Sequence, residues 1–265
     1  MTLEQLDAEI VVVSDIHLTS VADERGQLLL KLLKNLSENV QYFILNGDIF
    51  DFCFGKDPYF KEKFLKLGIC FEHLGCKGTK IIFVEGNHEF AMQDLGWQSV
   101  QVVDETQYVL SASDGRIIAV THGDLLSDDP WYRRFRRVIK SKKTHSLAAM
   151  IPGRWLDLYA LNHARISRAQ DRYRHLDHYK IIEAAFSWLG ESKAHSGIFG
   201  HFHVPYCEDR EVKNENRNVV CLESWDKPNI LVYREGSFFR SYLHDWEKTG
   251  RWNFIKPVSF FDVNT

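Results

Sequence analysis

Residues 10–17 read IVVVSDIH, and this stretch decides the fold, because the apolar run at residues 10–13 is followed within four residues by Asp15 and His17. A short, continuous apolar run is typical of a strand that is buried on both faces of a parallel sheet. The runs Tyr42 to Leu45 and Ile81 to Val84 repeat the pattern. Strands that alternate with helical segments predict an α/β protein whose first sheet is largely parallel, with right-handed crossovers.

The segments between and after these runs predict the remaining elements. A helical stripe of apolar residues separates the first two strands, and it comprises Leu28, Leu29, Leu32, Leu33 and Leu36. Gln107 to Ser111 and Arg116 to Thr121 flank Asp114-Gly115, which is a hairpin signal. Residues 130–189 have helical spacing and few strand-like runs, so we expect a helical insertion there.

After this insertion the sequence returns to strand patterns. Gly197 to Phe199 resembles the earlier buried strands. Alternating runs at Val204 to Val212, Val219 to Glu223 and Ile230 to Tyr233 predict a second sheet of antiparallel strands. We expect one domain that spans residues 1–265 and contains the insertion.

Composition excludes several classes of protein. The 265 residues are 45% hydrophobic and 26% charged, as in ordinary globular proteins, and the formal charge of −3 argues against a general nucleic-acid binder. The odd count of 5 cysteines argues against a closed disulfide framework and favours the cytoplasm. The N-terminal MTLEQLDAEIVVV does not resemble a secretory signal, and the sequence contains no apolar run of about 18 residues, so we expect no membrane span.

Five polar loops follow apolar runs and carry side chains that bind metals. They are Ser14-Asp15-Ile16-His17, Asn46-Gly47-Asp48-Ile49-Phe50-Asp51, Glu85-Gly86-Asn87-His88-Glu89, Thr121-His122-Gly123-Asp124 and Gly200-His201-Phe202-His203. Open α/β sheets place their ligands at the carboxyl ends of their strands. One such loop alone is ordinary turn chemistry. Five in the order of the strands predict a metal site, because core packing has no use for so many polar groups there.

The mixture of oxygen and imidazole donors points to two divalent ions. Such ligands suit Mn²⁺, Fe²⁺ or Zn²⁺, and we expect Mn²⁺; the absence of cysteine from the loops argues against a structural zinc site. A carboxylate can bridge two ions about 3.5–4 Å apart, and such a pair acidifies a shared water and binds a phosphoryl group. The expected reaction is attack of this hydroxide on phosphorus.

The ordered motifs D-x-H, G-D-x-x-D, G-N-H-E, H-G-D and G-H-x-H resemble the signature of the calcineurin-like metallophosphoesterases. The resemblance implies an α/β/β/α sandwich of two mixed sheets flanked by helices, with a helical lid at residues 130–189. It implies one ion held by Asp15, His17, Asp48 and His203, and a second held by Asp48, Asn87, His122 and His201. It also makes His88 a catalytic imidazole, oriented by Glu89 or Asp51.

A narrower resemblance concerns residues 122–136, HGDLLSDDPWYRRFR. They are similar to the UDP-2,3-diacylglucosamine hydrolases of Gram-negative lipid A synthesis, as are residues 47–55 and Ser224-Trp225. This branch cleaves the diphosphate of its nucleotide-sugar lipid to UMP and 2,3-diacylglucosamine 1-phosphate. The resemblance implies that Asn87, Asp129 and Tyr132 contact the substrate. His88 departs from the branch, whose best-known members have Arg in that loop.

The insertion itself has two interpretations. Residues 131–143, WYRRFRRVIKSKK, combine seven Lys or Arg with aromatic residues, which suits an anionic inner-membrane surface; a solvated basic helix is the alternative. The apolar residues around Pro152-Gly153 either line a pocket for acyl chains or cap the core. Four arginines could contact phosphate or uridine, namely Arg165, Arg168, Arg172 and Arg174.

The sequence therefore predicts a cytoplasmic hydrolase that is peripheral to the inner membrane of a Gram-negative bacterium, with no nucleic-acid partner. Three alternatives remain open. The enzyme could act on another nucleotide, phosphodiester or phosphoprotein substrate. It could be a non-catalytic scaffold, although no expected ligand is missing from the sequence. A nuclease is least favoured, because the basic residues gather in the insertion alone.

Overall fold

The computed structural model describes residues 2–103, 107–126, 129–169, 177–212, 215–257 and 259, with only the backbone for residues 163–169. The strands are β1 (Ile10–Val13), β2 (Tyr42–Asn46), β3 (Cys53–Phe54), β4 (Lys80–Val84), β5 (Glu89–Phe90), β6 (Val100–Val103), β7 (Tyr108–Ser111), β8 (Ile117–Thr121), β9 (Ser196–Phe199), β10 (Cys207–Val212), β11 (Glu215–Cys221), β12 (Asn229–Arg234) and β13 (Ser237–Tyr242). The helices are α1 (Glu24–Lys34), α2 (Pro58–Lys63), α3 (Leu65–Cys76), the 3-10 helix η1 (Met92–Leu95), α4 (Pro130–Ile139), α5 (Lys142–Ala148), α6 (Gly153–Ala169), α7 (His178–Ser192) and α8 (Leu243–Thr249).

The first sheet has the strand order β13-β12-β1-β2-β4-β6. Its β1, β2, β4 and β6 strands run parallel, with Ile10 opposite Tyr42 and Tyr42 opposite Lys80. The apolar runs that predicted β1, β2 and β4 are therefore confirmed, within one residue at each end. All four residues of β1 are buried, which explains why the run is continuous rather than alternating.

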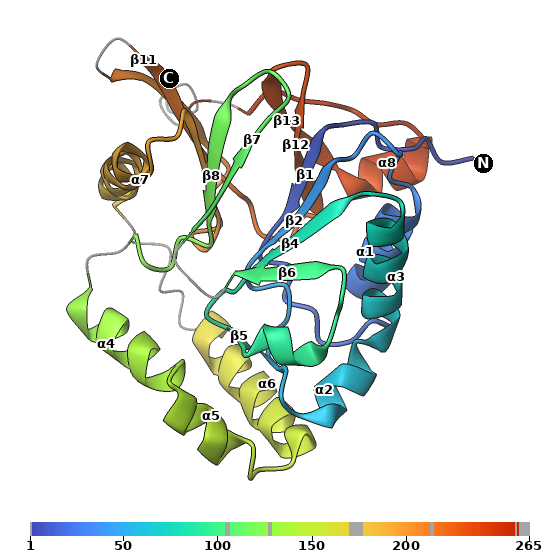
Figure 1. The fold of residues 1–265 in the computed structure, drawn as a ribbon, viewed down its shortest axis with the longest axis vertical. Coiled ribbons are helices and arrows are strands. Elements are labelled where there is room, and N and C mark those ends of the chain that lie inside the picture. Colours follow the sequence, from blue (N-terminus) through green and yellow to red (C-terminus); the bar gives the residue numbers. More distant parts are fainter. Residues whose placement is uncertain are drawn as a thin grey trace.

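Side chains alternate between the two faces of this sheet and so divide the core into layers. Val11 and Val13 pack with the leucines of α1 and with α3, whereas Ile10 and Val12 pack against the second sheet. The outer face of the second sheet packs against α7 in a third cluster. Figure 1 shows the resulting order of helices, sheet, sheet and helix, which confirms the expected mixed α/β sandwich.

The second sheet, in the order β10-β11-β9-β8-β7, corrects one expectation. The predicted hairpin is present as β7 and β8, but β9 pairs parallel with both β8 and β11, so this sheet is mixed rather than antiparallel. The run Ile230 to Tyr233 was also misplaced, because it lies in β12 and pairs antiparallel with β1 in the first sheet. Its residues are all buried, so their pattern does not specify a sheet.

The expected insertion at residues 130–189 contains helices with different positions. Helices α4, α5 and α6 occupy the lower end of the molecule in Figure 1, while α7 packs on β9 and β11. Residues 170–176, within the expected insertion, lie outside the described residues. Among the helices that are described, none is long and apolar enough to span a membrane.

A buried ion pair fastens α6 to α2. The Asp157 carboxylate accepts hydrogen bonds from Lys63 Nζ at 2.6 Å and from the Tyr59 hydroxyl at 2.7 Å. The side chains of Lys63 and Asp157 are only 13% and 8% exposed. Removing one member of such a pair leaves a buried charge without compensation.

We therefore expect Asp157→Ala to lower the free energy of unfolding by roughly 3 kcal/mol, measured by urea denaturation. The exposed Asp209 on β10 offers a matched control, and Asp209→Ala should change the stability by less than about 0.5 kcal/mol. Equal stabilities for the two variants would show that the pair does not hold α6.

Candidate metal centre

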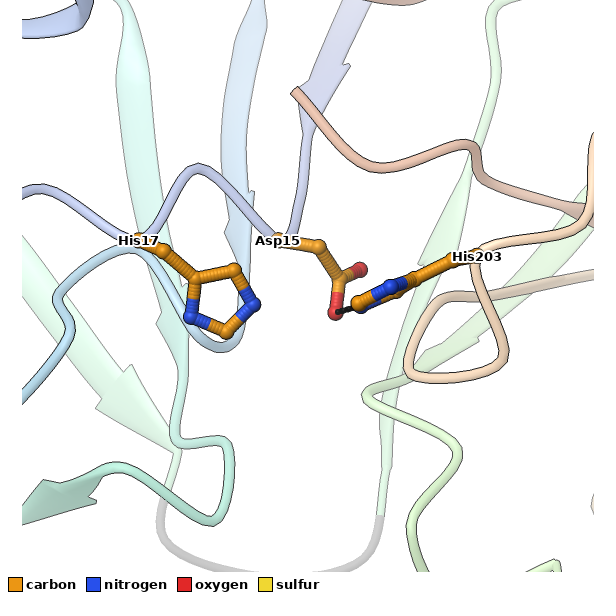
Figure 2. A group of neighbouring side chains, drawn as sticks. All are labelled: Asp15, His17 and His203. Carbon is orange, nitrogen blue, oxygen red and sulfur yellow. Dashed lines mark hydrogen bonds and ion pairs between the residues drawn. The ribbon is translucent and has the colours of Figure 1, made fainter. Parts of the chain in front are cut away.

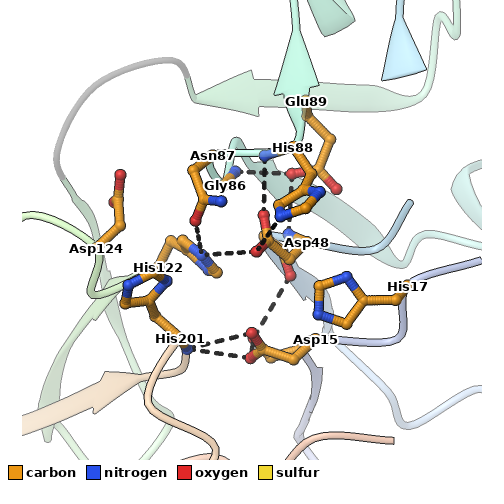
Figure 3. A network of polar contacts seen from close by, with 12 residues as sticks. Asp15, His17, Asp48, Gly86, Asn87, His88, Glu89, His122, Asp124 and His201 are labelled. Atoms are coloured by element: carbon orange, nitrogen blue, oxygen red, sulfur yellow. Dashed lines mark hydrogen bonds and ion pairs between the residues drawn. The ribbon is translucent and has the colours of Figure 1, made fainter. Parts of the chain in front are cut away.

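The loops after β1, β2, β4, β8 and β9 meet at one place between the two sheets. Figure 3 shows Asp15, Asp48, His122 and His201 facing one another there. In three sets of side chains, candidate ligand atoms lie within 4.8 Å of one another: Asp15, His17 and His203; Asp48, His122 and His201; and His17, Asp48 and His88. The first set is drawn in Figure 2. The structure thus brings together the loops that the sequence predicted to form one site.

Asp15 lies at the centre of the first set and is completely buried. Its carboxylate accepts hydrogen bonds from the Ser14 hydroxyl at 2.5 Å and from the backbone N–H of His201 at 3.2 Å. His203 Nε2 lies 3.1 Å from Asp15 Oδ1. His17 Nδ1 is buried, and among the described residues it has no hydrogen-bond partner; the Asp51 carboxylate is 3.6 Å away. An orphaned imidazole nitrogen beside a buried carboxylate fits a metal ligand.

Asp48 lies at the centre of the second set, with 3% of its surface exposed. His122 Nε2 is 3.4 Å from Asp48 Oδ2 and 3.2 Å from Asn87 Oδ1. His122 Nδ1 lies 3.1 Å from the carbonyl oxygen of Asn46, which can only accept a hydrogen bond. Nδ1 therefore carries a proton, so Nε2 is the nitrogen that can bind a metal, with its ring oriented by the carbonyl.

The backbone of these loops is unusual. Among the described non-glycine residues, eight have a positive φ, and five of them are expected ligands: Asp15 (50°), His17 (54°), Asp48 (50°), His201 (68°) and His203 (59°). This left-handed conformation costs roughly 1–2 kcal/mol per residue, and such strain is found mostly at functional sites. A Cβ atom at Gly86 would lie 2.2 Å from Asp48 Oδ1, so glycine is required where this loop approaches the carboxylate.

The electrostatics of the cluster favour bound cations. Burial raises the pKa of Asp48, but His88 and His122 outweigh it and hold this pKa well below its usual range. Burial lowers the pKa of His122, yet Asp48 raises it to about 10. Burial instead lowers the pKa of His17 and that of His201 to about 4. The carboxylates thus draw positive charge into the site, and a divalent ion can supply that charge in place of protons.

The three residues expected in catalysis have separate positions. His88 Nδ1 lies 2.7 Å from the backbone carbonyl of Asp51, which orients the ring. The Asp51 carboxylate faces His17 instead, at 3.6 Å. Glu89 is fully buried and accepts three backbone N–H bonds, from Gly86 at 2.8 Å, Asp48 at 2.9 Å and Phe50 at 3.1 Å. Glu89 therefore braces the two loops against each other.

The two expected lid contacts also differ in position. Asp129 is exposed and caps α4, accepting the N–H of Trp131 at 2.9 Å. Tyr132 lies at the metal centre, with its ring centroid 6.4 Å from that of His201. Its hydroxyl donates to Asp124 Oδ2 at 2.9 Å. The side chains of Arg165 and Arg168, and all of Arg172 and Arg174, lie outside the described residues.

Sequence reasoning missed Asp124 and Arg136. Arg136 Nε donates to the same Asp124 oxygen at 2.5 Å, so this buried carboxylate anchors α4 to the loop that carries His122. One signal was present, because Tyr132 and Arg136 are four residues apart and therefore share a helix face. For the anchoring role of Asp124, the sequence offers no indication other than its position after His122-Gly123.

The buried carboxylates and imidazoles between two mixed sheets define a metal-dependent phosphoesterase, which uses divalent ions. A family model described as calcineurin-like phosphoesterase matches residues 8–205. The chain belongs to the calcineurin-like phosphoesterase family.

Three known proteins illustrate what the chain is similar to. UDP-2,3-diacylglucosamine hydrolase of Neisseria meningitidis serogroup A is 29% identical over 228 residues, which cover 84% of this chain and 92% of that protein. The Haemophilus influenzae (strain PittGG) protein of the same name is 23% identical over 249 residues, covering 92% and 97%. The solved structure of Entamoeba histolytica Vps29 with zinc has a TM-score of 0.43 and 13% identity, covering 92% and 96%.

If His122 Nε2 is a metal ligand, metal binding should depend on pH, because His122 must then lose a proton. With the pKa of His122 raised to about 10, the proton is present at neutral pH, so Mn²⁺ affinity should rise with pH. Between pH 6 and 8 we expect about a tenfold rise per pH unit for each proton released.

Calorimetry in two buffers of different ionisation enthalpy measures the number of protons released. The exposed His244 supplies a control, and His244→Asn should leave that number unchanged. An affinity that stays constant from pH 6 to 8, with no proton release, would contradict this account.

Proposed function

We propose that this chain hydrolyses the diphosphate of UDP-2,3-diacylglucosamine, releasing UMP and 2,3-diacylglucosamine 1-phosphate. The observation that carries the proposal is the position of α4. Its Tyr132 reaches the metal centre through Asp124, while Trp131 and Phe135 on the same helix are 78% and 59% exposed. A substrate with both a diphosphate and acyl chains needs polar and apolar surfaces side by side. The names of the Neisseria and Haemophilus relatives support the same substrate.

For the metals we propose the ligand sets that the sequence predicted. One ion would be held by Asp15, His17, Asp48 and His203, and the other by Asp48, Asn87, His122 and His201. The grouping of Asp15 with His203 and of Asp48 with His122 supports this division, and the donors suit Mn²⁺. When bound, the ions supply Lewis acidity and an acidified water at the phosphorus.

His88 is the proposed proton donor to the leaving-group oxygen. Its Nδ1 donates to the Asp51 carbonyl, so Nε2 faces the site, 3.8 Å from Asp48 Oδ2. Burial lowers the pKa of His88, but Asp48 and the Asp51 carbonyl raise it above its ordinary value. Its side chain is 31% exposed, so the imidazole can reach a substrate atom and pass a proton to it. We propose that Asn87 and Tyr132 contact the substrate. Asp129 would contribute indirectly, because it caps the N-terminus of the helix that carries Tyr132.

We also propose that the protein is cytoplasmic and that helices α4–α6 contact the inner membrane. The apolar side chains of these helices and of the turn between α5 and α6 are largely exposed: Trp131, Phe135, Val138, Leu147, Met150, Trp155, Leu158 and Tyr159. Lysines and arginines lie among them in the sequence, as in surfaces that bind anionic lipid. This arrangement would bring the metal centre close to a membrane-resident substrate.

The substrate is tested by incubating Mn²⁺-loaded protein with UDP-2,3-diacylglucosamine and measuring UMP. We expect release of UMP by the wild type, loss of turnover in Asp48→Ala, and a fall in kcat of about 10²–10⁴-fold in His88→Asn. Hydrolysis of bis(p-nitrophenyl) phosphate without UMP release would reject this substrate and favour another phosphodiester. Failure of both reactions, with no metal bound, would favour the non-catalytic scaffold.

Membrane contact is tested by sedimentation with anionic phosphatidylglycerol vesicles. Burial of one aromatic side chain is worth about 1.5 kcal/mol or more, so Trp131→Ala and Phe135→Ala should each weaken binding about tenfold. Tyr179, which is 58% exposed on α7, provides the control, and Tyr179→Ala should bind as the wild type does. Unchanged binding by both α4 variants would reject this surface.

A further inference from the structure

Helix α4 is attached to the rest of the protein by polar contacts. The helix lies wholly within the described residues, and none of its side chains is buried. Tyr132, Arg136 and Lys140 hold it and, being spaced four apart, share one face. Arg133 Nη2 adds a hydrogen bond to the carbonyl oxygen of Leu125 at 3.0 Å. Tyr132 and Arg136 both bind Asp124, and Lys140, just after the helix, reaches the loop that carries Asn87 and His88.

Lys140 forms hydrogen bonds on both sides of the Asn87-His88 dipeptide in that loop. Its Nζ donates to the carbonyl oxygen of Gly86 at 2.8 Å and to that of Glu89 at 2.7 Å. These two residues immediately flank the Asn87-His88 dipeptide. A third bond, of 2.9 Å, joins Nζ to the Glu85 carboxylate, so all three ammonium protons have acceptors. The Lys140 side chain is only 12% exposed.

We infer that Lys140 is a positioning residue that fixes the Asn87-His88 dipeptide and so aims His88 at the leaving group. Neutralising the buried Glu85 would require only one contact. The two further bonds go to main-chain carbonyls on either side of the dipeptide, where they restrain its backbone. The His88 N–H also donates to Asp48 Oδ1 at 3.0 Å, which restrains the same dipeptide. The position of the proton donor therefore depends on the seating of α4.

This inference rests on the proposed role of His88 but not on the lipid substrate. Two soluble thymidine 5′-phosphodiesters test the inference separately from the lipid substrate. One has a phenol leaving group and the other has p-nitrophenol. Phenolate is the poorer leaving group and needs the proton, whereas p-nitrophenolate leaves without it. We expect Lys140→Met to lower kcat at least about tenfold on the phenyl ester and less than about threefold on the p-nitrophenyl ester.

Matched variants separate positioning from general damage. Lys66→Met removes an exposed lysine from α3, outside helices α4–α6, and should leave both rates unchanged. Lys140→Arg keeps a charged donor and should recover part of the rate on the phenyl ester. Equal losses of Lys140→Met on both esters, or no loss on either, would overturn the inference.

A second measurement does not depend on metal or turnover. Amide hydrogen exchange of the metal-free protein should be faster at residues 87–89 in Lys140→Met than in the wild type or Lys66→Met. Unchanged exchange at these amides would also overturn the inference. If UDP-2,3-diacylglucosamine is not hydrolysed but the leaving-group difference persists, only the proposed substrate fails.

Discussion

The structure depends on two carboxylates, Asp15 and Asp48, that are buried where the two sheets meet. Buried charge is costly unless other groups compensate it. Here the compensation comes from backbone and hydroxyl donors at the carboxylates and from imidazoles that gather around them. Because these groups arrive on loops from five strands, the sandwich must close correctly before the negative charge is balanced. The same closure of the two sheets therefore both completes the fold and creates the cation-binding site.

The same need for compensation extends to α4. Its inner face carries Tyr132, Arg136 and Lys140, which bind the acidic and carbonyl groups around the metal centre. Its outer face carries Trp131 and Phe135, which remain exposed. A helix that is held by hydrogen bonds on one side and exposes aromatic side chains among arginines elsewhere can bring a polar active site close to anionic lipid. This arrangement is the physical basis for our proposal that the substrate is a lipid-linked nucleotide.

Much of this arrangement was predictable from sequence, and the exceptions have common causes. Strands β1, β2 and β4 were predictable because burial on both faces demands continuous apolar runs. The sheet to which β12 belongs was not predictable, because its apolar residues are all buried and show no alternation that would identify the neighbouring strands. Glu89 and Lys140 act on main-chain N–H and carbonyl groups, which every residue possesses, so no partner motif reveals them. Asp129 matched a substrate-binding motif, yet an Asp before Pro130 equally caps a helix.

The left-handed backbone limits which substitutions can be accepted during evolution at five positions: Asp15, His17, Asp48, His201 and His203. Asparagine, aspartate and histidine tolerate such angles better than other side chains, and β-branched residues tolerate them worst. Replacement of a ligand by asparagine would thus remove charge while keeping the shape of its loop. Valine or isoleucine at the same position would distort the loop as well. Loss of catalysis without loss of architecture is consequently within reach of single substitutions, and a folded but inactive descendant is an accessible outcome.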